Sequence, residues 1–388
     1  MKNRRSGMNY VRKINIVFLC TIATIFLSNM IPFRDFVSNE ALLLLISQAI
    51  IAGPSIVFLI IESRRQNVLE INYPSMGYET REDKKSIREQ LCFHKVSISN
   101  VFWLILFTIC ITPAINFVNA ISRMFSVAAI NDTMFNITHK NSYLIALFCV
   151  AFVPCVMEEI VYRGLFYQGY RRVNPLGAAF LSAFLFGILH GNLNQFCYAF
   201  IMGIVFAFVI EATDSIVSTM IIHFIMNGWS ITLLYAIPRL FKYLNNMANE
   251  AIARGDQELA NSITKLIGTD VDFDQVFQAS GNAVLSDMKF IDILGTYGLT
   301  ALLGGILAFL IYRKIAKNTG RYEYIKSLFS KNKENRIESY HSVSGDGYKG
   351  EGKVKARALF TPPLWIAIAI CVFTLVINEL VLQGIISM

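Results

Sequence analysis

The chain has 388 residues, of which 54% are hydrophobic and 16% are charged, and its mean hydropathy of +0.49 lies well above that of a soluble domain. The net charge of +8 comes from Lys and Arg gathered in particular segments between apolar runs, a distribution typical of membrane proteins, so we expect no nucleic acid partner. The seven Cys form no CxxC pair and are interpreted as small buried hydrophobic side chains.

Apolar runs long enough to cross a bilayer recur along the whole chain. The sequence therefore predicts an all-α fold, a polytopic membrane helical bundle with about nine transmembrane helices embedded in the lipid bilayer. In chain order, the predicted helices lie near residues 16–33, 41–61, 101–121, 143–170, 176–190, 195–210, 215–236, 294–312 and 364–382.

Basic residues between these helices indicate how the chain is oriented. Residues 1–13 carry five Lys or Arg and no acid, and the segments 62–95 and 313–358 are also rich in Lys and Arg. Because basic segments stay on the cytoplasmic side, we expect a multi-pass protein of the cell membrane with a cytoplasmic N-terminus. The first apolar run is long and lacks a convincing cleavage site, so we interpret it as a retained helix. The abundance of Lys, Asn and Ile suggests a bacterial source.

The helices and loops divide the chain into four predicted regions. Residues 1–142 contain three helices and a cytoplasmic loop, and residues 143–236 contain four helices that form a membrane core. Residues 237–290 have mixed charge and helix-like apolar spacing, which indicates an external amphipathic segment and not a span. Residues 291–388 contain the last two helices and a basic cytoplasmic loop.

The helix predicted near 143–170 carries charges inside an apolar run: Glu158, Glu159 and Arg163, with Pro154 one turn before them. Charges at such a depth cost several kcal/mol each, so they are rare unless they are paired or functional. Glu159 and Arg163 are four residues apart and can form an ion pair. Glu158 points about 100° away around the helix and has no partner nearby in sequence. We expect Pro154 to kink the helix.

Two histidines lie in later predicted spans. His190 shares a helix face with Phe186, and His223 shares one with Asn227. At a rise of about 1.5 Å per residue, Glu158, His190, His223 and Asn227 lie about 14–24 Å from the cytoplasmic ends of their helices. Three helices can therefore present these side chains to one buried cavity, although depth alone does not show that their faces converge.

These residue types suit amide hydrolysis without a covalent intermediate. A carboxylate can act as general base on water, and a neighbouring histidine can help to hold that water. A second histidine and an amide can donate hydrogen bonds to the developing oxyanion. Taken singly, each residue also has a structural explanation as an ion pair, a packing residue or a helix–helix hydrogen bond. Metal-dependent hydrolysis with His and Glu as zinc ligands is the competing chemistry, although the sequence has no HExxH motif.

Three patterns on successive helices resemble a known family: Glu-Glu-x-x-x-Arg at 158–163, Phe-x-x-x-His at 186–190 and His-x-x-x-Asn at 223–227. They resemble the CAAX prenyl protease and bacteriocin-processing family (CPBP, or Abi), which is described as intramembrane glutamic endopeptidases. The resemblance covers about residues 143–236 and makes this region the expected catalytic core.

The resemblance implies a role for each of these residues. Glu158 would activate water with His190 as its partner, and His223 and Asn227 would form the oxyanion hole. Glu159, Arg163 and Phe186 would support the site. The resemblance also implies that no metal or other cofactor is needed, and that the partner is a membrane-associated peptide or protein, prenylated or otherwise lipophilic.

Two alternatives belong to other functional classes. Some bacterial members of the family confer bacteriocin immunity, so the chain could be a non-hydrolytic immunity or binding protein with the same fold. Buried carboxylates and histidines also relay protons in transporters. The sequence shows no obvious inverted repeat or matched pair of broken helices, which argues against a proton-coupled transporter, but Pro154 keeps that alternative open.

Overall fold

The computed structural model describes residues 2–72, 86–126, 131–171, 173–267, 289–330 and 356–386, and no strand occurs within them. The longer helices are α1 (Lys2–Asn29), α3 (Glu40–Asn72), α5 (Ile98–Ser122), α10 (Pro175–Ile188), α11 (Leu193–Thr213), α12 (Ile216–Ala253), α16 (Leu299–Asn318) and α19 (Pro362–Leu382). The shorter ones are α2 (Phe33–Phe36), α4 (Ile87–Gln90), α6 (Asn131–Lys140), α7 (Tyr143–Ala146), η1 (Leu147–Phe152), α8 (Val153–Glu158), η2 (Glu159–Tyr167), α9 (Gln168–Arg171), α13 (Gln257–Ile267), α15 (Phe290–Ile293), η3 (Leu294–Gly298), α17 (Tyr322–Leu328) and η4 (Ala356–Leu359).

Eight helical segments within the described ranges are long and apolar enough to cross a membrane, which confirms an all-α, polytopic membrane bundle. Each helix predicted from the sequence coincides with a helix of the structure. The one predicted near 176–190 is α10, which has only 14 residues. Its length of about 21 Å is shorter than the hydrocarbon core of about 30 Å. The described chain therefore has eight candidate spans plus this shorter helix, where about nine spans were predicted.

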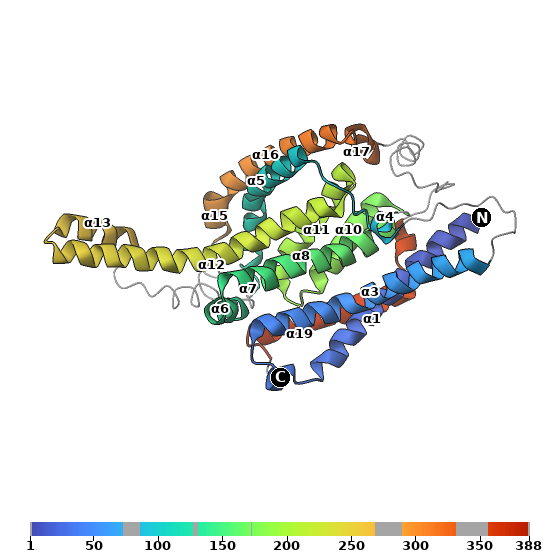
Figure 1. Cartoon of the computed structure of the whole chain (residues 1–388), viewed down its shortest axis with the longest axis horizontal. Helices are drawn as coiled ribbons and strands as arrows, with labels where there is room; N and C mark the ends of the chain where they lie inside the picture. The colour runs from blue at the N-terminus through green and yellow to red at the C-terminus, as the bar shows by residue number, and fades with distance from the viewer. Residues whose placement is uncertain are drawn as a thin grey trace.

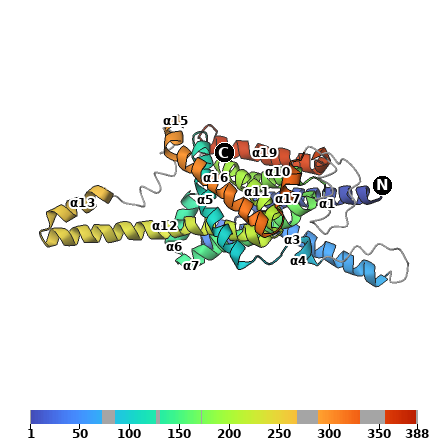
Figure 2. The same ribbon diagram turned by 90° about the horizontal axis from the view of Figure 1, so that it is seen from above.

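The helix predicted to end at Ala236 is much longer in the structure. α12 continues through Pro238 to Ala253, and with 38 residues it is about 57 Å long. Pro238 lacks the N–H that would bond to the carbonyl of Leu234, yet the helix continues past it. One turn of this region is also bridged by the guanidinium of Arg239, which donates to the carbonyl of Tyr235 at 2.7 Å. Figures 1 and 2 show α12 extending far beyond the other helices, with α13 folded back along it. The predicted amphipathic segment is thus an α12–α13 hairpin as far as residue 267, and residues 268–288 lie outside the described ranges.

The charged span from Tyr143 to Arg171 is not a regular α-helix. Two π-helical stretches interrupt it: η1 before Pro154, and η2 from Glu159 onward. Each π-helical turn holds one more residue than an α-helical turn, so it rotates the side chains that follow it. The sequence predicted a kink at Pro154, and the structure adds a change of helical register on either side of that residue. Such π-helical segments are frequent at functional sites.

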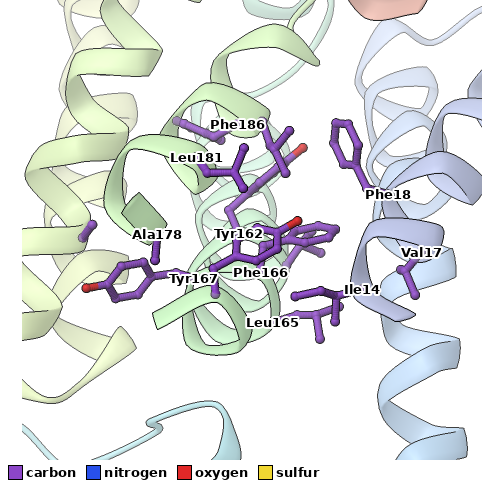
Figure 3. Packing of buried hydrophobic residues seen from close by; sticks show 14 of the residues in the cluster. Ile14, Val17, Phe18, Tyr162, Leu165, Phe166, Tyr167, Ala178, Leu181 and Phe186 are labelled. Carbon is purple, nitrogen blue, oxygen red and sulfur yellow. The ribbon is translucent and has the colours of Figure 1, made fainter. Parts of the chain in front are cut away.

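The main core forms where α1, η2, α10 and α19 pack together. Figure 3 shows Ile14 and Phe18 of α1 facing Phe166 of η2, and the rings of Phe18 and Phe166 meet edge to face at 5.7 Å. α10 also packs closely on α11. A Cβ at Gly203 would lie 2.7 Å from the Cα of Ala183, so this contact requires glycine. These contacts hold η2 and α10, which carry Glu159, Arg163 and Phe186 of the predicted site, within the core of the bundle.

A buried cluster of polar side chains joins the charged span, α11 and α17. In this Glu211 cluster, Arg171 Nε lies 2.8 Å from Glu211 Oε1 and the Tyr324 hydroxyl donates to Oε2 at 2.7 Å. The Tyr167 hydroxyl also donates to the same carboxylate. Arg321 Nε donates to the backbone carbonyl of Glu211 at 2.6 Å. The sequence does not show that these side chains meet, because they come from distant segments.

Replacing Glu211 with glutamine should strongly destabilise the protein. The change removes the carboxylate that lies 2.8 Å from the buried guanidinium of Arg171 and 3.7 Å from that of Arg321, and leaves Asp214 as their remaining counter-charge. Removing one partner of a buried ion pair costs on the order of 3–5 kcal/mol. We expect a clearly lower thermal unfolding midpoint in detergent. Glu250→Gln is the matched control, because Glu250 pairs with Arg254 on the exposed surface; equal midpoints for the two variants would show that the cluster does not stabilise the fold.

Candidate functional site

The two adjacent glutamates lie at the junction between α8 and η2 and differ in their access to solvent. Glu158 is the last residue of α8 and Glu159 is the first residue of η2. The side chain of Glu158 is 15% exposed, whereas Glu159 is completely buried at 0%. A water-sized molecule can therefore touch the side chain of Glu158 but not that of Glu159.

Glu159 forms the predicted ion pair with Arg163. The Glu159 Oε1 atom lies 3.1 Å from Arg163 Nη1, and Arg163 itself is only 1% exposed. The guanidinium lies over the rings of Phe186 and Phe206, at 4.2 and 4.8 Å from their centroids. Such cation–π contacts stabilise a desolvated guanidinium by about 2 kcal/mol. Phe186 thus contacts the ion pair directly.

His223, on α12, lies between the two carboxylates. Its Nδ1 atom is 3.0 Å from Glu159 Oε1, and its Nε2 atom is 3.8 Å from Glu158 Oε2. When Nδ1 donates its proton to Glu159, the ring orientation is set and Nε2 is turned toward Glu158. The sequence placed His223 at a suitable depth, and the structure brings it into contact with Glu159.

Glu158 has a partner that sequence reasoning missed. The side-chain amide of Gln48 in α3 donates to Glu158 Oε1 at 2.9 Å, across 110 residues of sequence. The available signal was a glutamine in the middle of the apolar run near 41–61. Such a residue is expensive in a membrane unless it is hydrogen-bonded. That signal does not say which helix supplies the partner.

His190 lies in the turn that follows α10. Its Nδ1 atom is 2.9 Å from the carbonyl oxygen of Phe186. Since a carbonyl can only accept, Nδ1 carries the proton and Nε2 is free to accept a hydrogen bond in the neutral ring. The Phe186 ring meets the His190 ring at 5.0 Å and the His223 ring at 6.1 Å. Within the described ranges, no direct hydrogen bond joins His190 to Glu158.

The turn after His190 is held by a helix outside the predicted core. Gly191 has a φ of +67°, in the left-handed region that favours glycine. Its carbonyl accepts a hydrogen bond at 3.0 Å from the side-chain amide of Asn378 in α19. The position of His190 therefore depends on α19 as well as on α10.

Asn227 lies one helical turn after His223 on α12 and is half-buried. Its amide donates to the carbonyl of Val150 in η1 at 3.4 Å, a long hydrogen bond. The amide has a second N–H, and that donor remains available to another acceptor. The structure thus groups Glu158, Glu159, Arg163, Phe186 and His223 closely, and places His190 and Asn227 at the edge of this group.

Taken together, these side chains provide a carboxylate that water can reach, two imidazoles and an amide inside an apolar bundle. This set can accept a proton from water and donate hydrogen bonds to an oxyanion. Among the residues that the structure describes, no three His, Cys, Asp or Glu side chains come together as metal ligands.

Comparison with known proteins gave one family. Residues 140–229 match the family model described as Type II CAAX prenyl endopeptidase Rce1-like. The match contains all three patterns identified in the sequence and confirms the resemblance to the CAAX protease family. No curated protein and no solved structure matches the chain.

Proposed function

From the CAAX protease match over residues 140–229, we propose that the chain is an intramembrane endopeptidase that hydrolyses a peptide bond in a membrane-associated peptide. The match supports a membrane protease at the level of the family. The glutamic mechanism and a prenylated or otherwise lipophilic substrate are our proposal. We further propose that the protein lies in a bacterial cell membrane with its N-terminus in the cytoplasm.

In the proposed mechanism, Glu158 takes a proton from a water molecule while the water oxygen attacks the carbonyl carbon of the substrate. His190, with Nε2 free to accept, helps to hold that water. His223 and Asn227 donate hydrogen bonds to the oxyanion; for this, His223 must also be protonated at Nε2, because Nδ1 faces Glu159. When the C–N bond breaks, the proton held by Glu158 passes to the leaving amine.

This proposal rests on the difference in burial and partners between Glu158 and Glu159. Glu159 is sealed in an ion pair with Arg163, and its Oε1 atom also faces His223. Glu158 is partly exposed and is fixed by an amide on one oxygen. A general base needs access to the proton that it abstracts, so the geometry favours Glu158 as the base and Glu159 as the residue that orients His223.

The test is cleavage of a defined peptide in liposomes that contain the purified protein. A farnesylated peptide with a CAAX-type C-terminus should be shortened, and mass spectrometry should locate the cut. The same peptide without the lipid distinguishes recognition of the prenyl group from recognition of the peptide alone. If folded protein cleaves neither peptide, nor any peptide of a membrane-associated library, the endopeptidase proposal is wrong.

Cleavage should continue at an unchanged rate after treatment with EDTA or phenanthroline. The proposed base is a carboxylate, and the mechanism takes its nucleophile from water without a metal ion. The measurement is the initial rate before and after chelation, with a zinc protease in parallel as the control for effective chelation. Loss of activity that zinc restores would mean that Glu158, His190 and His223 act as metal ligands.

A further inference from the structure

Gln48 is a buried polar residue in a span that is otherwise strongly apolar. It is 7% exposed, and the only other buried polar side chain among the described residues of α3 is Ser55. Placing an amide in an apolar environment is unfavourable unless the amide is hydrogen-bonded. The position of Gln48 within α3 therefore calls for a partner, and that partner is Glu158.

The hydrogen bond from Gln48 engages one oxygen of Glu158 and leaves the other free. Gln48 Nε2 donates to Oε1 at 2.9 Å, while Oε2 lies 3.8 Å from His223 Nε2. A glutamate carboxylate otherwise rotates over a broad range about its last side-chain bond. Anchoring Oε1 restricts this rotation and keeps Oε2 on the side of His223.

We propose that Gln48 is a positioning residue that holds the Glu158 carboxylate in the orientation needed to take a proton from water. Gln48 lies outside residues 140–229, so α3 adds this contact to the part of the chain that matches the protease family. The proposal rests on the proposed function, because a positioned base matters only if Glu158 is the base. Gln48 itself does not touch the substrate in this scheme and acts through Glu158.

A purely structural role for Gln48 has different consequences. A hydrogen bond that only bridges α3 and α8 would contribute to stability and not to the reaction. Its loss would lower the unfolding midpoint and leave the rate per folded molecule unchanged. Loss of positioning lowers kcat instead, since misplacing a reacting group by about 1 Å can cost up to about 100-fold in rate. Substrate affinity should change little, because the ground-state complex does not use this contact.

The experiment measures kcat, KM and the unfolding midpoint of Gln48→Met in the same liposome assay. Methionine has nearly the length of glutamine and suits a membrane helix, but it cannot donate to Glu158. We expect kcat to fall on the order of 10- to 100-fold, with KM within about threefold of wild type. Ser47→Ala is the matched control on the same helix, because among the described residues the Ser47 hydroxyl bonds only to the carbonyl of Leu44, and it should behave as wild type.

A second variant keeps the test decisive if Gln48→Met does not fold. Gln48→Asn retains an amide on a side chain that is shorter by one methylene. We expect its kcat to lie between those of wild type and Gln48→Met. Wild-type kcat in a folded Gln48→Met or Gln48→Asn variant overturns the positioning role, provided that wild type cleaves and Glu158→Gln does not. If wild type itself cleaves nothing, or Glu158→Gln cleaves normally, it is the proposed function that fails.

Discussion

Glu158→Gln should insert and fold like the wild-type protein and lose its cleavage activity. Glutamine keeps the size and hydrogen-bonding shape of the side chain, and Gln48 can still donate to its carbonyl oxygen. It cannot take a proton from water, and loss of a general base lowers rates on the order of 100- to 10,000-fold. Because the side chain is partly exposed and its contact with His223 Nε2 is long, at 3.8 Å, we expect little loss of stability.

The measurement is the rate of product formation per folded molecule, with the unfolding midpoint recorded on the same preparation. Glu250→Gln, at an exposed surface position, is the control for the substitution itself and should cleave like wild type. Turnover at the wild-type rate by folded Glu158→Gln would show that another group activates the water. A fall in the midpoint with normal turnover would show that Glu158 is a structural residue.

Asn227→Ala should slow catalysis strongly while leaving substrate affinity nearly unchanged. Asn227 and His223 lie one turn apart on α12, so both can direct donors to one point. A donor that is used only when the oxyanion forms stabilises the transition state and not the bound substrate. Losing one such donor costs on the order of 100- to 1,000-fold in kcat.

The observed contact of Asn227 suggests the competing explanation. Its amide donates to the carbonyl of Val150 at 3.4 Å, and such a bond between helices stabilises by around 1 kcal/mol. Ser230→Ala is the control, because in the described part of the chain the Ser230 hydroxyl bonds only within its own helix, to the carbonyl of Met226. If Asn227→Ala unfolds at a lower temperature and yet cleaves at the normal rate per folded molecule, the oxyanion role is wrong.

Glu158→Gln and Asn227→Ala change residues within the family match, whereas two side chains that contact the site lie outside it. Gln48 of α3 holds Glu158, and Asn378 of α19 holds the turn after His190. The family match covers residues 140–229 and contains neither residue. The helices that flank the core therefore contact the candidate site, and under the proposed function we expect variation in them to adjust the reaction without altering the motifs.

The sequence could not predict the contacts between distant helices, and the reason is physical. Sequence spacing shows which residues share a helix face, but not how each helix is rotated toward its neighbours. The π-helical stretches η1 and η2 change that rotation within the charged span, and no sequence pattern predicted them. The contact of His223 with Glu159 and that of Gln48 with Glu158 both depend on such rotations.

The features that the sequence determined by itself depend on properties of neighbouring residues, whose contributions add along the chain. Apolar length and the distribution of charge predicted a polytopic helical bundle, and the four-residue spacing of Glu159 and Arg163 predicted their ion pair. The tertiary structure alone decided that α12 extends through Pro238 to Ala253 and that Glu211 binds residues of distant segments. Patterns of hydrophobicity and helical periodicity predict the contacts that residues make within one or two turns of the same helix. A hydrogen bond across 110 residues depends on how every intervening helix packs.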